Sequence, residues 1–230
     1  IPKRLNAAEN YRAVWFGRYP FGMFYLNSIK VLALRVTSDL LTSSLAAYGF
    51  ARLRFRGRDA IFLIYLGSMM IPGQMLLIPR FVFFRWLGIY NTLWAVALPG
   101  MFTAFGVFLL RQYFITIPFE LSESATIDGA NELQIFWRII LPLAKPALAS
   151  LGILAAVWSW NDYEGPLIML NDIQKYTIPL GLTTYMDEHG TQQFTLIMAA
   201  ATSAILPILI IFLFFQKHFV RGIATTGLKG

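Results

Sequence analysis

Long apolar stretches separated by short polar ones dominate the pattern along this chain. A helix needs about 20 mostly apolar residues to cross a hydrocarbon core roughly 30 Å thick. Runs such as FLIYLGSMMIP are apolar on every face, whereas a barrel strand alternates polar and apolar positions. The pattern therefore predicts an all-α, polytopic membrane helical bundle over residues 24–216. Its expected spans are residues 24–50, 60–83, 92–113, 147–169 and 195–216.

Composition and charge agree with a membrane protein. Hydrophobic residues make up 57% of the chain and charged residues 13%, and the mean hydropathy is +0.59. The net charge of +7 is spread over segment ends rather than one stripe, which argues against a nucleic-acid partner. The chain has no cysteine, so it has no disulfide framework.

The basic residues predict an orientation in the lipid bilayer. The loop ARLRFRGR, residues 51–58, carries four arginines, and loops rich in Lys and Arg stay in the cytoplasm. Alternation then places the loop 114–146 and the tail 217–230 inside. The N-terminal segment 1–23 and the loop 170–194 are expected outside.

The most polar part of the inner loop is ESATIDGANELQIFWRIILP, residues 123–142. Pro118 suits the first turn of a helix and Gly129 the position after a helix ends, which predicts one short helix between them. Asn131 then caps a second helix, expected to end at Pro142. Its predicted apolar stripe is Ile135, Phe136, Ile139 and Ile140.

Both helices are too short to span a membrane, and the first carries Glu120, Glu123 and Asp128. Physical chemistry leaves two readings open: an amphipathic connector at the membrane surface, or a docking element for another protein. Ser122, Ser124 and Ala125 keep one side of the first helix narrow enough to enter a groove on another protein.

A family resemblance favours docking. The stretch resembles the EAA loop of permease subunits of binding-protein-dependent ABC importers. Ser124 stands where the family usually has alanine, which keeps a small residue there. The resemblance implies contact with an ATPase subunit through Glu123, Ser124, Ala125, Asp128, Gly129, Ile139, Leu141 and Pro142.

Further segments, among them MIPGQMLLIP, LGIYNTLWAVALPG and the ending QKHFVRGIATTGLKG, resemble the smaller permease subunit of maltose-type carbohydrate importers. The resemblance extends from about Asn27 onward. It implies a type I ABC importer permease fold with a cytoplasmic EAA coupling helix. Six helices are usual in that family, so a first membrane helix is expected to be missing here.

The same resemblance implies the partners: a second permease subunit in a heterodimer, two ATPase subunits and an external solute-binding protein, in a bacterial or archaeal cytoplasmic membrane. No GxxxxGK[ST] phosphate loop occurs in the sequence. ATP and Mg²⁺ are therefore expected on the ATPase subunits, with no cofactor on this chain and no enzymatic activity of its own. The resemblance also implies that the tail touches the ATPases through Gly227, Lys229 and Gly230, against the alternative of a solvated end.

Two groups of polar residues interrupt the apolar spans. Arg35 and Asp39 lie four apart on one helix face, which predicts an intramembrane ion pair, with substrate contact as the alternative. In WSWNDYEGPL, residues 158–167, aromatic rings and polar groups are suited to sugars, although an interfacial aromatic belt would look similar. The candidate pathway residues are Trp158, Trp160, Asn161 and Asp162.

Two rival classes are weaker. A secondary transporter would use Arg35, Asp39 and Asp162 for ion coupling, but gives no reason for the docking loop. A membrane enzyme lacks a recognisable nucleophile or metal cluster, and no metal site is expected. The expected solute is a saccharide, a polyol or a glycerol phosphate ester.

Overall fold

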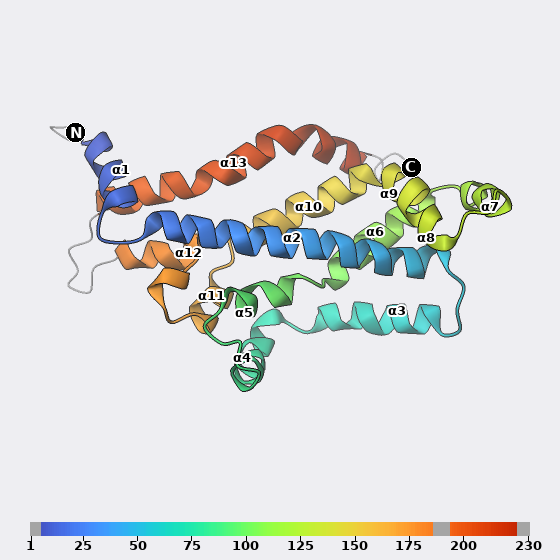
Figure 1. Ribbon diagram of the computed structural model, residues 1–230, viewed down its shortest axis with the longest axis horizontal. Coiled ribbons are helices and arrows are strands. Elements are labelled where there is room, and N and C mark those ends of the chain that lie inside the picture. The colour runs from blue at the N-terminus through green and yellow to red at the C-terminus, as the bar shows by residue number, and fades with distance from the viewer. Residues whose placement is uncertain (1–5, 186–193, 225–230) are drawn as a thin grey trace. The chain divides into compact units, whose positions relative to one another are not determined.

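The structure, a computed structural model, describes residues 6–185 and 194–224, and within that part of the chain it contains helices and no strands (Figure 1). This confirms the predicted all-α fold. The α-helices are α1 (Ala7–Phe16), α2 (Phe21–Arg52), α3 (Arg58–Gly67), α4 (Leu77–Trp86), α5 (Leu93–Ala97), α6 (Ala104–Thr116), α7 (Glu120–Ile127), α8 (Glu132–Ile135), α9 (Leu141–Leu143), α10 (Lys145–Trp160), α11 (Glu164–Met169), α12 (Ile178–Gly181) and α13 (Phe194–Ala224).

Short helical turns join several of these helices. Five are 3-10 turns and one, η4, is a π-helical turn that leads from α8 into α9. They are η1 (Ser68–Met70), η2 (Gly73–Leu76), η3 (Leu98–Gly100), η4 (Phe136–Ile140), η5 (Ile173–Lys175) and η6 (Leu182–Tyr185).

The chain forms two compact units, and the long helix α2 contributes its first part to one and its second part to the other. The first unit comprises Ile1–Leu34, Gln74–Leu98 and Val157–Leu213. The second unit comprises Arg35–Gly73, Pro99–Ala156 and Phe214–Gly230.

Aromatic side chains dominate the core of the first unit. Phe21 and Phe24 of α2 are fully buried and pack with Trp160 and Tyr185 in one cluster. The Tyr185 hydroxyl donates to the carbonyl of Val14 at 3.3 Å, and burial raises its pKa to about 12. This core joins the start of α2 to α10, α13 and the segment before residue 186.

The core of the second unit lies between the end of α2 and helices α3, α6, α8 and α10. Its largest fully buried side chains are Leu110, Phe114, Ile135, Phe136, Ile140 and Leu151. Leu110 and Phe114 of α6 lie four residues apart, as do Phe136 and Ile140 of η4, which places each pair on one face of its helix. This core positions the candidate site.

Among the described residues, one helical stretch, Leu93–Thr116, is long and apolar enough to cross a membrane. Two further pairs of helices are each bent at a short break, and the number of candidate spans is three if each pair counts as one span. They are Arg58–Met70 with Gly73–Trp86, and Glu132–Leu143 with Lys145–Trp160. Phe194–Ile210 is a shorter apolar stretch. The five spans and their orientation stay a prediction.

Candidate functional site

The inner loop forms a helix–turn–helix, as the sequence predicts. Helix α7 ends at Ile127, and Gly129 follows with φ +84°, in the left-handed region that glycine adopts without strain. Asn131 caps α8: its Oδ1 accepts from the Gln134 amide at 2.9 Å, and the Gln134 side chain accepts from the Asn131 amide at 2.9 Å. The predicted roles of Gly129 after the first helix and of Asn131 as the cap of the second are thus confirmed. We call residues 118–143 the coupling hairpin.

Two boundaries differ from the prediction. Pro118 lies two residues before α7, whose N-cap is Phe119. The second helix does not end at Pro142. The π-turn η4 follows α8 and leads directly into α9, which contains Pro142. Proline has no amide hydrogen to donate, and the wider turn accommodates it without breaking the segment.

Most of the predicted coupling residues are accessible on the hairpin. Glu123, Ser124, Asp128, Gly129 and Pro142 are exposed. By contrast, Ala125, Ile139 and Leu141 pack partly against the core of the second unit. The predicted stripe is confirmed, with Ile135, Phe136 and Ile140 buried and Ile139 partly buried.

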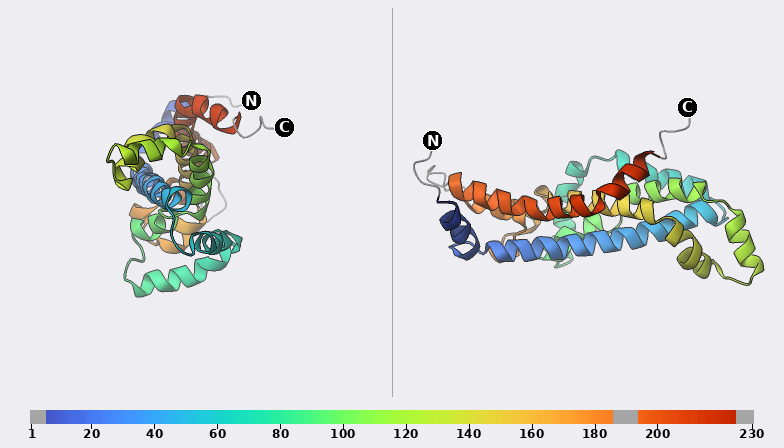
Figure 2. Two further views of the ribbon diagram at one scale, coloured as in Figure 1. Left: turned by 90° about the vertical axis from the view of Figure 1, so that its right-hand side faces the viewer. Right: turned by 90° about the horizontal axis from the view of Figure 1, so that it is seen from above.

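Large apolar side chains also face outward from the hairpin. Ile127 is 87% exposed and Leu133 62% exposed, and Leu121 is exposed on the same short helix as Glu123. In Figures 1 and 2, α7 projects beyond the C-terminal end of α2. This element presents a mixed acidic and apolar surface, which is suited to a protein partner.

The base of the hairpin is held by residues that the sequence did not single out. Arg52, which the sequence pattern places in the loop 51–58, is instead the last residue of α2 and is 7% exposed. It donates to the carbonyls of Phe114 at 2.9 Å and Ile117 at 2.6 Å, and burial lowers its pKa. Tyr48, one turn earlier, donates to Glu132 Oε2 at 2.5 Å. Tyr48 and Arg52 are four residues apart at the end of α2, and this spacing was the sequence signal that could have placed both on one helix face.

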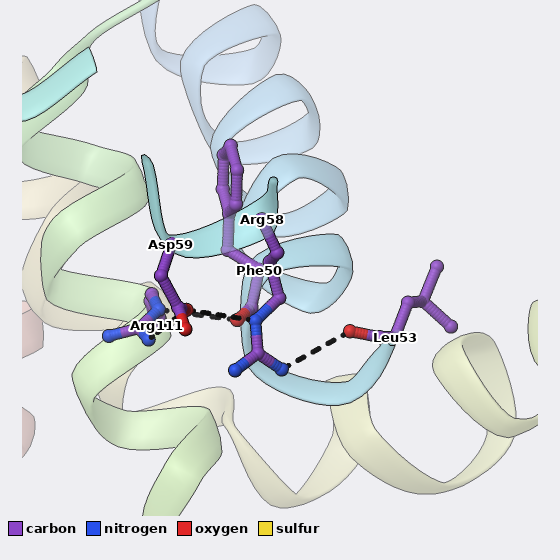
Figure 3. Close-up of polar contacts among 5 residues, drawn as sticks. All are labelled: Phe50, Leu53, Arg58, Asp59 and Arg111. Carbon is purple, nitrogen blue, oxygen red and sulfur yellow. Dashed lines mark hydrogen bonds and ion pairs between the residues drawn. The ribbon is translucent and has the colours of Figure 1, made fainter. Parts of the chain in front are cut away.

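Two of the remaining loop arginines, Arg54 and Arg58, line a shallow recess of about 400 Å³ next to the start of α3. Figure 3 shows Asp59 between two guanidinium groups: Arg58 at 3.0 Å and Arg111 at 3.9 Å. The hydrogen bond from Arg58 holds the pKa of Asp59 below its usual value. Arg111 also lies over the ring of Phe62, 4.2 Å from its centroid.

The carboxylate of Asp39 has partners other than the expected Arg35. Its Oδ1 accepts from Ser43 Oγ at 2.9 Å, Thr103 Oγ1 at 2.7 Å and the Thr103 amide at 3.2 Å. Asp39 is 1% exposed. Three donors therefore satisfy this buried charge, and the side chain of Arg35 lies instead against the backbone of Gly100.

The candidate pathway residues separate into different environments. Trp160 is buried, and its Nε1 donates to the carbonyl of Ala204 at 2.9 Å, while Trp158 is 52% exposed. Asp162 accepts from the Gly165 amide at 3.1 Å, and the Asn161 side chain donates to the carbonyl of Val157 at 2.9 Å. Trp160 is thus a packing residue, and Trp158 is the more accessible aromatic group.

The proposed tail contacts, Gly227, Lys229 and Gly230, lie outside the described residues. Within residues 6–185 and 194–224, no group of three or more His, Cys, Asp or Glu side chains could hold a metal ion.

Comparisons with known proteins agree on one family. Residues 40–225 match the family model described as "Binding-protein-dependent transport system inner membrane component". The arabinooligosaccharides transport system permease protein AraQ of Halalkalibacterium halodurans is 38% identical over 216 residues, covering 94% of this chain and 74% of that protein. The sn-glycerol-3-phosphate transport system permease protein UgpE of Yersinia pestis is 34% identical and covers 89% of this chain and 73% of that protein.

A solved structure is also similar. A chain in the crystal structure of a bacterial ABC transporter involved in the import of the acidic polysaccharide alginate has a TM-score of 0.82 and 29% sequence identity. The match covers 91% of this chain and 79% of that chain.

Proposed function

Because the chain belongs to the family of binding-protein-dependent transport system inner membrane components, we propose that it forms half of the membrane pathway of an ATP-driven carbohydrate importer. A permease of this family is embedded in the membrane and is not itself an enzyme. The observation that carries the proposal is an accessible coupling hairpin in a chain whose relatives are named as sugar and glycerol phosphate permeases.

The solute is a carbohydrate or a related ester. The similar proteins named above are a permease for arabinooligosaccharides, one for sn-glycerol-3-phosphate and a transporter for alginate. The exposed indole of Trp158 supplies the kind of face on which a sugar ring stacks. The second permease subunit and an external solute-binding protein complete the recognition of the solute.

The coupling hairpin docks in a groove of an ATPase subunit. Ile127 provides an apolar anchor at the end of α7, and Glu123 provides a charged neighbour. The buried stripe of the following segment fixes the hairpin to the membrane part. Closure of the two ATPase subunits on ATP and Mg²⁺ then moves the hairpin, and the pathway changes from inward to outward access.

The first experiment is to purify the full-length chain in mild detergent from its native bacterial membrane and to identify its companions by mass spectrometry. We expect a second permease and two ATPase subunits. The complex is then placed in vesicles with its binding protein, and uptake of labelled oligosaccharides, polyols and glycerol 3-phosphate is measured with and without ATP. Uptake by the chain alone on an ion gradient would overturn the proposal in favour of a secondary carrier.

A variant tests the docking surface itself. Ile127→Asp places a charge on the proposed apolar anchor, and we expect the ATPase subunits to be lost from the purified complex. Phe16→Asp is the matched control, because Phe16 is similarly exposed at 85% but lies in the segment expected outside the membrane. Equal retention of the ATPase subunits by both variants would contradict docking through α7.

A further inference from the structure

The entry of the coupling hairpin is held by the last residue of α2. Arg52 donates Nη2 hydrogen bonds to the carbonyls of Phe114 and Ile117, at 2.9 and 2.6 Å. These carbonyls belong to the C-terminal end of α6, where a cation is favoured because the last carbonyls have no intrahelical donor. The same guanidinium lies 5.4 Å from the ring centroid of Phe119, the N-cap residue of α7.

The exit of the hairpin is held one turn earlier on the same helix. The Tyr48 hydroxyl donates to Oε2 of Glu132, the first residue of α8, at 2.5 Å. The Tyr48 ring packs edge-on against Phe136, with centroids 5.3 Å apart. Tyr48 is 6% exposed, so the donor side of this hydrogen bond is shielded from water, while the acceptor Glu132 lies at the surface.

Two contacts constrain more than one does. A segment tied to a helix at one point can pivot about that point, whereas ties at entry and exit prevent the pivot. Tyr48 and Arg52 are four residues apart and therefore lie on one face of α2, one turn from each other. The coupling hairpin and the end of α2 thus have little freedom to move separately.

We propose that Tyr48 and Arg52 act as a two-point clamp through which α2 follows the motion of the coupling hairpin. They are positioning residues, since neither is exposed enough to reach an ATPase subunit. The inference rests on the proposed function and adds the route by which movement enters the membrane part: from α7 into α2, as well as along the covalent chain through α6 and α8.

The first test measures the clamp without transport. The chain has no cysteine, so spin labels are placed at Leu45→Cys on α2 and Glu120→Cys on α7 in the assembled complex. We expect one narrow distance distribution between the labels. The combined change Tyr48→Phe with Arg52→Lys should broaden it clearly, because lysine keeps the charge but lacks the planar fork that reaches two carbonyls.

Matched controls are available nearby. Tyr65→Phe removes a hydroxyl from a tyrosine packed against the same core. Arg54→Lys changes an exposed arginine two residues from Arg52. Both controls should keep the narrow distance distribution. The clamp would be overturned if only the control variants broadened the distribution, or if no variant did.

The second test measures coupling. In vesicles, the Tyr48→Phe with Arg52→Lys variant should assemble and hydrolyse ATP, but solute imported per ATP hydrolysed should fall about five- to tenfold, as expected for one to two lost hydrogen bonds. A loss of stability alone would lower uptake and hydrolysis together and leave this ratio unchanged. An unchanged ratio would overturn the proposal.

A double-mutant cycle isolates the exit contact and uses a change that does not disturb the core. Glu132 is exposed, so Glu132→Ala leaves the buried packing intact. Tyr48→Phe, Glu132→Ala and their combination should lower the import ratio by similar amounts, because all remove the same hydrogen bond. Effects that multiply in the combination would show that the two residues act independently, which contradicts the clamp.

The two proposals fail differently. If the unchanged chain imports no solute on ATP with its partners, the proposed function is wrong. If the unchanged chain imports on ATP while the clamp variants match Tyr65→Phe and Arg54→Lys, only the clamp is wrong.

Discussion

Thr103 gives both its hydroxyl and its amide hydrogen to one carboxylate oxygen of Asp39, at 2.7 and 3.2 Å. The same hydroxyl oxygen caps α6, since it accepts from the Gly106 amide at 3.0 Å. A single buried acid in α2 thereby positions the N-terminal end of α6. Because α6 leads directly to the coupling hairpin, this contact bears on how the site is held.

Replacing Asp39 with leucine should lower the free energy of unfolding by about 3 kcal/mol, because the Thr103 amide and the Ser43 hydroxyl lose their acceptor. Asp39→Asn should cost less, since its amide oxygen still accepts. Thermal unfolding of the detergent-purified chain measures both variants. A leucine variant as stable as the unchanged chain would contradict the role given to this contact.

Gly106 allows α6 to approach α2 closely. A Cβ atom at this position would lie 2.4 Å from Ser43 Oγ and 2.8 Å from Thr103 Oγ1. We expect Gly106→Ala to lower the melting temperature by several degrees, because both hydroxyls must move away from Asp39. Unfolding followed by loss of detergent-soluble protein on heating provides the measurement.

Gly152→Ala is the matched control for this change, since its Cβ would meet Leu40 at an ordinary 3.6 Å within a helix. Alanine favours a helix over glycine, so this control should be neutral or stabilising. Ser43→Ala combined with Gly106→Ala should recover part of the loss by removing one clashing oxygen. Equal melting temperatures for Gly106→Ala and Gly152→Ala would contradict the close approach of α6 to α2.

Local signals explain how much of the candidate site the sequence could predict. Gly129 and Asn131 act through their own backbone and the next three residues, so their structural roles follow from the sequence itself. The apolar stripe at Ile135 follows from helical spacing for the same reason. The helix–turn–helix was therefore predicted closely, apart from its ends.

Contacts between distant residues explain what the sequence could not predict. Asp39 meets Thr103, which lies 64 positions later, whereas helical spacing suggested its neighbour Arg35. Arg52 looks like the other arginines of its loop, and only the carbonyls at the end of α6 distinguish it. Trp160 matches a sugar-binding pattern, but its partner is the carbonyl of Ala204 on α13.

Trp160 and Trp158 should respond differently to the same substitution. Trp160→Phe removes the buried hydrogen bond to Ala204 and should lower stability by about 1 kcal/mol, with little change in the KM for solute. Trp158→Phe should raise the KM for solute if the exposed indole contacts it. Unfolding and vesicle uptake are measured on both, and a KM effect confined to Trp160 would reverse the assignment.

The contact between Arg58 and Asp59 should depend on pH. The hydrogen bond from Arg58 lowers the pKa of Asp59 below its ordinary value of 3.8. The stabilisation is thus complete above that value and is lost as the pH falls below it, through the lowered pKa of the folded chain. Because the Asp59 side chain is largely exposed, the effect should be local and weakened by salt.

A spin label at Arg56→Cys, in the loop before α3, should therefore become more mobile as the pH is lowered from 5 through about 3.8 to about 3. Asp59→Asn is the control, since its amide does not titrate, and its label should be equally mobile over the whole range. Higher salt should make the spin label in the chain with Asp59 more mobile, and so closer to the label in Asp59→Asn. A pH response that persists in Asp59→Asn would assign the titration to another group.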